Sequence, residues 1–357
     1  MRFLQGETLM KRFILSILIC SICIFTLASC SFAGDKSTDD SAPAIYHFEP
    51  LTDIKEGRKN LYLIIKVMDS NYWQVITKGA KAAGDDFDCN VYCGSTSIET
   101  DWQGQHVLIE EAISQNADAI ILAPDDSIEL TGDLDKLNDL GIRVALIDTA
   151  ANTDSFDICY MTDNLLAGQK AAQEMIYQLH EAGFSDYNDV SVGIMVGAAT
   201  SQTINERLAG FYQYWSGNAP GKWTIISDIM NYNGNLDQAG ELVTAFLQNN
   251  PNVCGLYGTN NGPTRTLCQK IKEQNRTDIT VVGFDFSDEM KDLIESSEYR
   301  ASTILQRQYD MGYRAVESMV NLFNGKTLKT KFVDTGVVTV NNSTINSNDV
   351  IDVLKFN

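Results

Sequence analysis

Positive charge is scarce in this chain of 357 residues, which has 27 Lys and Arg against 47 Asp and Glu and a formal net charge of −20. Binding to a phosphate backbone requires a basic surface, so we expect no nucleic-acid partner. An anionic membrane surface would also repel this protein. Hydrophobic residues make up 44% and charged residues 21% of the chain, which is typical of a folded globular protein rather than a disordered or fibrous one.

Histidine is also rare, because only His47, His106 and His180 are present and they lie far apart along the chain. A metal site usually combines several His and Cys residues, so we expect none. Five of the eight cysteines follow residue 30, an odd number that argues against a fully paired disulfide framework. Cys89 and Cys93 lie about 13 Å apart if they share a strand, too far for a disulfide. Buried free thiols are the favoured interpretation, and the sequence leaves any disulfide open.

The motifs of common enzyme classes are missing. The chain has no G-x-S-x-G, H-E-x-x-H or P-loop motif and no Cys/His pair. The loop Met68–Trp73 after the first predicted strand lacks glycine, so its backbone could not approach a dinucleotide pyrophosphate. Asp148 and Asp285 could supply the two carboxylates of a glycosidase, but nothing in the sequence marks one of them as an acid. We expect a protein that is not an enzyme and binds no cofactor.

The one long apolar run lies near the N-terminus, where Lys11 and Arg12 precede fifteen mostly apolar residues. Fifteen helical residues span only about 22 Å, short of the ~30 Å hydrocarbon core, which favours a secretory signal over a membrane anchor. The run ends in Leu27-Ala28-Ser29-Cys30. This ending resembles the lipobox of bacterial lipoproteins, which implies a signal peptide over residues 1–29 and lipid attachment to Cys30.

Residues 30–57 are predicted to form a flexible tether, because much of this segment is rich in Ser, Thr, Asp and Pro and shows no periodicity. No second long apolar run follows it. We therefore expect a soluble body outside the cytoplasm, lipid-anchored to the bacterial cell membrane. Starts of translation at Met1 and at Met10 both fit this interpretation.

From about residue 60 the chain alternates apolar segments with amphipathic ones, the pattern of parallel strands and covering helices. Leu61–Val67 is a continuous apolar run, as expected of a strand covered on both faces. A first block has predicted strands at 61–67, 89–93, 119–123, 143–147 and 159–162 and helices at 72–86, 103–115 and 130–140. A second block has predicted strands at 191–196, 223–229, 254–257, 280–284 and 301–305, helices at 165–181, 203–215, 236–247, 264–274, 288–294 and 310–323, and extended chain over 331–340.

Two such blocks predict two lobes with a cleft between them. Ligands of open parallel sheets bind beyond the carboxyl ends of the strands, so the residues that follow each strand are candidates for the site. Asp148, Asn260, Asp285 and Gln306 stand at such positions. Each could be only a cap or turn residue, but together they offer carboxylates and amides to vicinal hydroxyls. No Lys or Arg dominates this set, so it suits a neutral polyol better than an anion.

The loop after the first strand adds Ser70, Tyr72 and Trp73. Aromatic faces pack on the C–H faces of a sugar ring, and a hydroxyl can bond the sugar's own hydroxyls. The alternative is structural, with Asp69 or Ser70 as a helix cap and the two aromatic residues in the core.

Several short motifs occur in an order that resembles the type I periplasmic-binding-protein family, within it the ribose/galactose-type sugar-binding lipoproteins of ABC importers. The similarity runs from about residue 60 to about residue 341. The motifs are Asn71-Tyr72-Trp73 with Lys78-Gly79-Ala80, Ala123-Pro124-Asp125-Asp126-Ser127, Thr162-Asp163-Asn164 before Gly168, Asn205-Glu206-Arg207 before Gly210-Phe211, Val281-Val282-Gly283-Phe284-Asp285, and Gln306 before Met311-Gly312-Tyr313.

The resemblance implies an α/β fold of two Rossmann-like lobes with parallel sheets, joined by a three-strand hinge. Residues 58–162 plus 308–334 would form the N-terminal lobe, and residues 163–307 plus 335–357 the C-terminal lobe. Tyr72 and Trp73 would sandwich the ligand ring from one lobe, with Tyr232 opposite, and Arg207 would brace the second lobe. The implied ligand-binding residues are Ser70, Tyr72, Trp73, Asp148, Asn205, Tyr232, Asn260, Asp285 and Gln306.

The sequence departs from ribose-binding members, which carry arginines at the positions of Thr149 and Asn205, while Lys66 is an extra cation. The ligand therefore stays open among hexoses, pentoses, polyols and short oligosaccharides. The resemblance implies a monomer that captures a sugar by hinge closure and delivers it to the permease subunits of an ABC importer. The alternative is a sensor that presents its ligand to a membrane receptor such as a histidine kinase, and the sequence does not separate the two.

Overall fold

The computed structural model describes residues 46–199 and 201–356. The predicted signal peptide, Cys30 and the tether up to residue 45 lie outside the described residues. Within the described part, no helix combines the length and the apolar character needed to cross a membrane.

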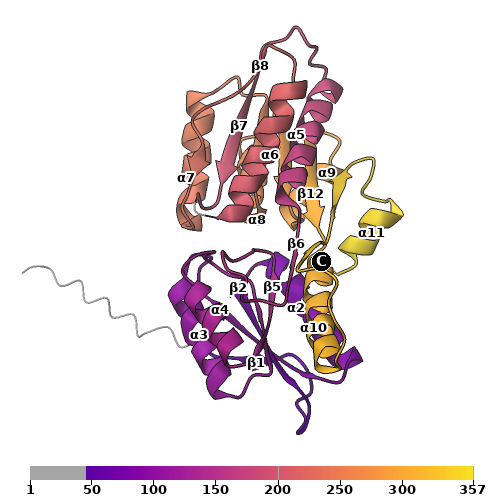
Figure 1. The fold of residues 1–357 in the computed structure, drawn as a ribbon. Coiled ribbons are helices and arrows are strands. Elements are labelled where there is room, and N and C mark those ends of the chain that lie inside the picture. Colours follow the sequence, from indigo (N-terminus) through magenta and orange to yellow (C-terminus); the bar gives the residue numbers. More distant parts are fainter. Residues whose placement is uncertain (1–45, 200, 357) are drawn as a thin grey trace, which may run out of the picture. The chain divides into compact units, whose positions relative to one another are not determined.

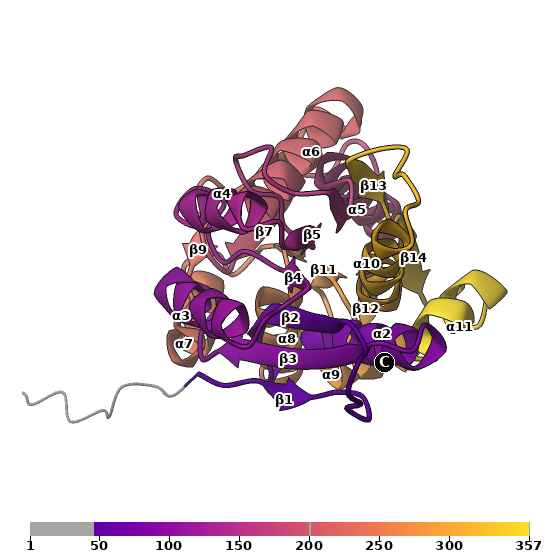
Figure 2. The same cartoon turned by 60° about the horizontal axis from the view of Figure 1, so that its bottom comes forward.

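The first sheet has seven strands in the order β1-β3-β2-β4-β5-β6-β13, parallel except for the edge strand β1 (Figures 1 and 2). Helices α3 and α4 lie on one face of this sheet, and α2 and α10 lie on the other (Figure 2). The strands are β1 Glu49–Pro50, β2 Asn60–Val67, β3 Asn90–Thr96, β4 Ala119–Leu122, β5 Arg143–Ile147, β6 Ile158–Met161 and β13 Phe332–Asp334. The helices are α2 Asn71–Asp86, α3 Trp102–Ser114, α4 Thr131–Asp139 and α10 Gln308–Phe323.

The second sheet runs β14-β12-β11-β10-β7-β8, with β9 also paired to β7, and only its edge strand β14 is antiparallel. The strands are β7 Val190–Val196, β8 Trp223–Ile225, β9 Met230–Asn231, β10 Gly255–Gly258, β11 Thr280–Phe284, β12 Arg300–Gln306 and β14 Val337–Asn341. The helices are α5 Asn164–Glu181, α6 Gln202–Asn218, α7 Leu236–Asn249, α8 Asn261–Glu273, α9 Asp288–Glu295 and α11 Asn348–Leu354.

Strand β2 explains why a parallel strand can be apolar throughout. Its residues alternate between two hydrophobic clusters, because Leu61, Leu63 and Ile65 pack under α2 and α10 while Tyr62 and Ile64 pack under α3 and α4. Successive side chains of a strand point to opposite faces, so a sheet covered on both faces needs apolar residues at every position. The predicted α/β class with two Rossmann-like lobes is confirmed.

The chain passes between the two sheets three times, after β6, after β12 and between β13 and β14. Helix α10 therefore packs on α2 of the first lobe although it follows β12 of the second (Figure 1). A hydrogen bond from Thr162 Oγ1 to Gln306 Oε1, 2.7 Å long, joins the first two crossovers. The third crossover is tied to the first, because the Thr335 amide donates to the Met161 carbonyl at 2.9 Å.

Three predictions about local structure need correction. The tether does not extend to residue 57, because β1 pairs with β3 and Thr52 is buried against the same strand. The predicted strand over 223–229 is interrupted, since β8 ends at Ile225 and β9 begins at Met230. The extended segment 331–340 is two strands in different sheets, and helix α11 was not predicted. The five cysteines of the described part are buried and free, as expected.

Helices α5 and α6 pack backbone against backbone, and two glycines permit this. A Cβ on Gly168 would lie 2.1 Å from the Arg207 carbonyl oxygen, and a Cβ on Gly210 would lie 2.0 Å from the Leu165 carbonyl oxygen. No side-chain rearrangement relieves a clash with a backbone atom, so both helices would have to move.

We expect Gly210→Ala to lower the free energy of unfolding by about 1–3 kcal/mol, the usual cost of overpacking. Gly217→Ala is the matched control in the same helix, because a Cβ there meets nothing within 4 Å. Alanine favours a helix over glycine, so this control should be neutral or stabilised by about 0.5–1 kcal/mol. Denaturant unfolding of both variants tests the contrast, and equal midpoints would contradict the close packing.

Candidate functional site

Two aspartates stand at corresponding places in the two lobes. Asp148 directly follows β5 and Asp285 directly follows β11, and both have a left-handed backbone, with φ of 63° and 64°. Each backbone amide donates to the neighbouring strand, Asp148 to the Tyr160 carbonyl and Asp285 to the Ile304 carbonyl, both at 2.9 Å. Aspartate adopts this conformation more readily than most residues, and such backbone strain is common at functional sites.

Asp148 lies at the centre of a buried cluster in the first lobe. Its carboxylate accepts hydrogen bonds from the Tyr72 hydroxyl and from Thr149 Oγ1, and the Lys66 ammonium lies 3.5 Å away. Lys66 also donates to Thr149 Oγ1 at 3.1 Å. Burial alone would raise the pKa of Asp148, but Lys66 and the two hydroxyl donors outweigh it and hold the pKa below its usual value. Asp148 is therefore an ionised hydrogen-bond acceptor.

Trp73 lies beside this cluster and is 2% exposed. Its ring meets Tyr72 edge to face, with centroids 4.9 Å apart, and its indole Nε1 donates to Glu99 Oε1 at 3.1 Å. The Lys66 ammonium lies 5.8 Å from the Trp73 ring centroid. The indole N–H of Trp73 therefore already has an acceptor. The negative charge of Glu99 also contributes to the raised pKa values of Tyr232, Asp125 and Asp285.

Asp285 has fewer favourable partners than Asp148. Its Oδ1 accepts from Gln306 Nε2 at 2.9 Å and from Gln308 Nε2 at 3.4 Å, and it is 3% exposed. Burial raises the pKa of Asp285 to about 7 despite the opposing charge of Arg207 and the Gln306 hydrogen bond, while Asp148 and Glu99 raise it further. The Asp148 charge is thus among the causes that raise the pKa of Asp285, although the two residues follow strands of different lobes.

Arg207 is a buried cation of the second lobe. It is 3% exposed, its Nε donates to Asn164 Oδ1 at 2.8 Å, and its guanidinium donates to the Thr259 carbonyl at 2.9 Å. The guanidinium carbon lies 4.2 Å from the Phe284 ring centroid. These contacts brace helix α6 against strands β10 and β11, which agrees with the bracing role expected of Arg207.

The other predicted residues divide into two groups. Tyr232 is buried, and its hydroxyl and the Asn260 amide both lie 3.1–3.2 Å from the position a Cβ on Gly197 would take, so these two side chains are neighbours. Ser70 is half-buried at the N-cap position of α2 and makes no side-chain capping bond. Asn205 is exposed, and its amide donates to the Ala199 carbonyl at 3.0 Å. No described contact joins any of these four residues to the two aspartates.

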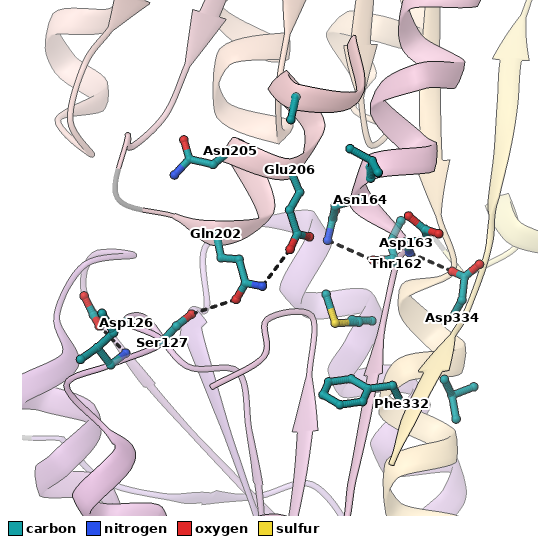
Figure 3. A pocket seen from close by; sticks show the side chains of 15 residues that line it. Asp126, Ser127, Thr162, Asp163, Asn164, Gln202, Asn205, Glu206, Phe332 and Asp334 are labelled. Atoms are coloured by element: carbon teal, nitrogen blue, oxygen red, sulfur yellow. Dashed lines mark hydrogen bonds between the residues drawn. The ribbon is translucent and has the colours of Figure 1, made fainter. Parts of the chain in front are cut away.

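Asn205 instead lines a groove of about 960 Å³ beside the crossovers (Figure 3). Ser127 of the first lobe and Gln202 of the second meet there, with Ser127 Oγ 3.5 Å from Gln202 Oε1. The groove is lined by Asp126, Ser127, Ile128, Met161, Thr162, Asp163, Asn164, Leu165, Gln202, Asn205, Glu206, Ala209, Phe332, Val333 and Asp334.

Sequence reasoning missed Glu99, Gln308 and the bonding role of Thr149. Glu99 follows β3, so the rule of inspecting residues beyond strand ends could have found it. Gln308 stands two residues after Gln306 and could have been found in the same way. His106 also lies closer to acidic groups than expected, because His106, Glu110 and Asp133 offer ligand atoms within 4.8 Å of one another. That cluster lies on α3 and α4, and Lys136 already pairs with Glu110.

The shifted carboxylates predict an unusual pH dependence. The pKa values of Asp285 and Asp125 are raised to about 7, mainly by burial, so the native state binds more protons than the unfolded state between about pH 4 and pH 7. Stability should fall as pH rises through this window. Asp285→Asn should remove the part of this loss in the free energy of unfolding that comes from Asp285. That part is up to roughly 4 kcal/mol for a pKa shift of this size.

Denaturant unfolding at pH 4.5 and 7.5 measures the difference for the protein and the variant. Asp228→Asn is the control, because Asp228 is an exposed aspartate of the same lobe. If Asp285→Asn kept the full pH dependence, Asp285 would be ionised at little cost and the burial argument would be wrong.

Comparisons with known proteins identify the family of this chain. Residues 61–327 match the family described as periplasmic binding protein domain. The D-apiose import binding protein of Actinobacillus succinogenes is 26% identical over 249 residues, which cover 70% of this chain and 76% of that protein. The D-allose-binding periplasmic protein of Escherichia coli is 24% identical over 269 residues, covering 72% and 83%.

Solved structures show the same architecture. An ABC transporter solute-binding protein of Agrobacterium vitis with bound D-fucose has a TM-score of 0.75 at 25% identity, covering 82% of this chain and 99% of that one. A carbohydrate transporter solute-binding protein of Agrobacterium radiobacter in complex with D-arabinose has a TM-score of 0.78 at 23% identity, covering 84% and 99%, and supports the fold alone. The resemblance drawn from the sequence motifs is confirmed: this chain belongs to the periplasmic binding protein family.

Proposed function

We propose that this protein captures a sugar outside the cytoplasm and delivers it to an ABC importer. The observation that carries the proposal is the pair Asp148 and Asp285, one from each lobe, both buried on matching left-handed turns directly after strands β5 and β11. The sugar-binding relatives named above support the ligand class. We further propose that the protein acts as a monomer and is not an enzyme.

The chemistry of the side chains suits a polyol. Asp148 and Asp285 accept hydrogen bonds, while the amides of Asn260 and Gln306 can donate and accept. Tyr72, Trp73 and Tyr232 provide apolar ring surface beside these polar groups. We propose as ligand-binding residues Tyr72, Trp73, Asp148, Tyr232, Asn260, Asp285 and Gln306, with Lys66 and Glu99 added, while Ser70 and Asn205 stay predictions.

Capture would proceed by hinge closure. Gln306 lies on the second crossover and bonds both Thr162 of the first crossover and Asp285 of the site, so a group that binds Asp285 also acts on the hinge. A ligand held by both aspartates is bound fully only when the lobes are together. It shifts the balance between open and closed forms by its preference for the closed one.

The lipobox-like ending at Cys30 supports a lipid anchor on the outer side of the cell membrane. Such a tether would keep the protein close to permease subunits. Cys30→Ala should release the protein into the medium or block its maturation, and metabolic labelling with a radioactive fatty acid would detect the loss of lipid.

Binding of sugars provides the direct test. A thermal-shift screen against neutral sugars, polyols, nucleosides and amino acids should show stabilisation by one sugar or polyol, because a ligand of the native state raises stability by RT ln(1 + [L]/Kd). Stabilisation by a nucleoside or amino acid alone would keep the fold and refute the sugar proposal.

Calorimetry with the sugar so found should then rank the site residues. Measured at pH 8, where both carboxylates are ionised, Asp148→Asn and Asp285→Asn should each weaken binding about tenfold or more, because each loses a charged partner of a buried ligand hydroxyl. Asn205→Ala should change affinity less than threefold, since its amide is already bonded to the Ala199 carbonyl. A loss for Asn205→Ala equal to the aspartate variants would place Asn205 in the site.

Deletion of the gene separates transport from sensing. If the protein serves an importer, the mutant cell should lose uptake of the radiolabelled sugar at micromolar concentrations. If it serves a membrane receptor, uptake by cells with a constitutively expressed transporter should persist while sugar-dependent induction of transcription disappears. The second result would replace delivery by signalling and leave sugar binding intact.

A further inference from the structure

The groove beside the crossovers is a surface that the proposed site residues leave largely unused. Its volume of about 960 Å³ lies at the upper end of the range of about 300–1,000 Å³ that ligand pockets usually have. Both lobes line it, since Ser127 follows β4 of the first lobe and Gln202 begins α6 of the second (Figure 3). A molecule in this groove would therefore contact both lobes.

Part of the groove wall is apolar and carries an aromatic ring. Phe332 is 53% exposed, although its ring meets the ring of buried Phe156 edge to face, with centroids 5.5 Å apart. The contact with Phe156 supports the Phe332 ring and leaves much of its surface free. Ile128 and Leu165 of the same lining are 64% and 41% exposed. Exposed apolar side chains gathered in a concave surface are typical of a ligand site.

Hydrogen-bonding side chains lie above Phe332 in Figure 3, on the other side of the groove. Gln202 Nε2 donates to Glu206 Oε1 at 2.8 Å, and Ser127 Oγ lies 3.5 Å from Gln202 Oε1. The row keeps unused capacity, because an amide nitrogen has two donors and a carboxylate has two acceptor oxygens. The 15 described residues that line the groove include no Lys or Arg, so the lining does not suit an anion.

This combination suits a sugar ring. The C–H face of a sugar packs on the face of an aromatic ring, while its hydroxyls donate to carboxylates and exchange hydrogen bonds with amides. Phe332 offers the ring, and Gln202 and Glu206 offer the polar partners.

The groove adjoins the positions of both aspartates. Thr162 lines the groove and donates to Gln306 at 2.7 Å, and Gln306 donates to Asp285 at 2.9 Å, so two hydrogen bonds separate the groove wall from this carboxylate. In the first lobe β4 and β5 are parallel neighbours. Ser127 after β4 and Asp148 after β5 therefore leave the sheet at the same edge. A ligand held by the aspartates lies within reach of the groove.

We propose that the groove is a subsite for a second sugar unit, so that the ligand of this protein is a disaccharide or a longer oligosaccharide. One unit binds at the aspartates, and the next packs against Phe332 with its hydroxyls toward Gln202 and Glu206. This inference rests on the proposed sugar-capture function and names the size class of the ligand within it.

Calorimetry with matched ligands tests the size of the ligand. The panel pairs D-glucose with maltose and cellobiose, D-galactose with lactose and melibiose, D-xylose with xylobiose, and L-arabinose with arabinobiose. At least one disaccharide should bind about tenfold or more tightly than each of its monosaccharides, because the second unit adds buried apolar contact and hydrogen bonds.

Phe332→Ala tests the aromatic surface. It should weaken binding of that disaccharide about tenfold and leave the affinity for the monosaccharides within threefold, because only the second unit contacts the ring. Phe332→Tyr keeps the ring and should keep the preference, which separates loss of the ring from a disturbance of β13. Tyr187→Ala is the control, because Tyr187 is 85% exposed in the loop before β7, whereas the groove lies beyond the other end of that strand.

The outcomes separate this inference from the proposed function. Monosaccharides that bind as tightly as every disaccharide would overturn the inference and leave sugar capture standing. A disaccharide preference that survives in Phe332→Ala and in Gln202→Ala would overturn the assignment of the groove. If no sugar of either size binds, the proposed function falls and the inference falls with it.

Discussion

The amide of Gln306 connects the crossovers between the lobes to the proposed binding site. Its oxygen accepts from Thr162 on the first crossover, and its nitrogen donates to Asp285 at the site. Gln306 is 1% exposed, so neither bond can be replaced by bulk water without opening the structure. The Thr162 bond ties two crossovers together, and the Asp285 bond orients a carboxylate of the second lobe, so both depend on a single side chain.

The two lobes share one backbone feature, an aspartate on a left-handed turn, but surround it with different charges and hydrogen-bond donors. Both place an aspartate on a left-handed turn after a buried strand. Asp148 has a lysine at 3.5 Å and two hydroxyl donors, which lower its pKa, whereas Asp285 has only amide donors and a more remote arginine, and its pKa is raised to about 7. The site therefore combines one firmly ionised carboxylate with one that is easily protonated, although the backbone geometry is shared.

The sequence predicted what depends on local patterns and missed what depends on contacts between distant segments. Strands such as β2 and β11 are covered on both faces, so their apolar runs gave correct bounds within a residue. Strand β1 has two residues and exists only because β3 offers an edge, which no periodicity in the chain reveals. Asp148 and Asp285 follow strands and were predicted from that position, while the bond between Glu99 and Trp73 joins a loop to helix α2, an approach that no spacing predicts.

The cost of burying carboxylates would make closure of the proposed hinge depend on the ligand. Enclosing carboxylates without a ligand is unfavourable, chiefly because they lose hydration, as the raised pKa values of Asp125 and Asp285 reflect. A ligand that donates hydrogen bonds to carboxylates of both lobes offsets that penalty only in the closed form. Its affinity for the closed form then exceeds its affinity for either open lobe, and that difference sets how far binding shifts the population.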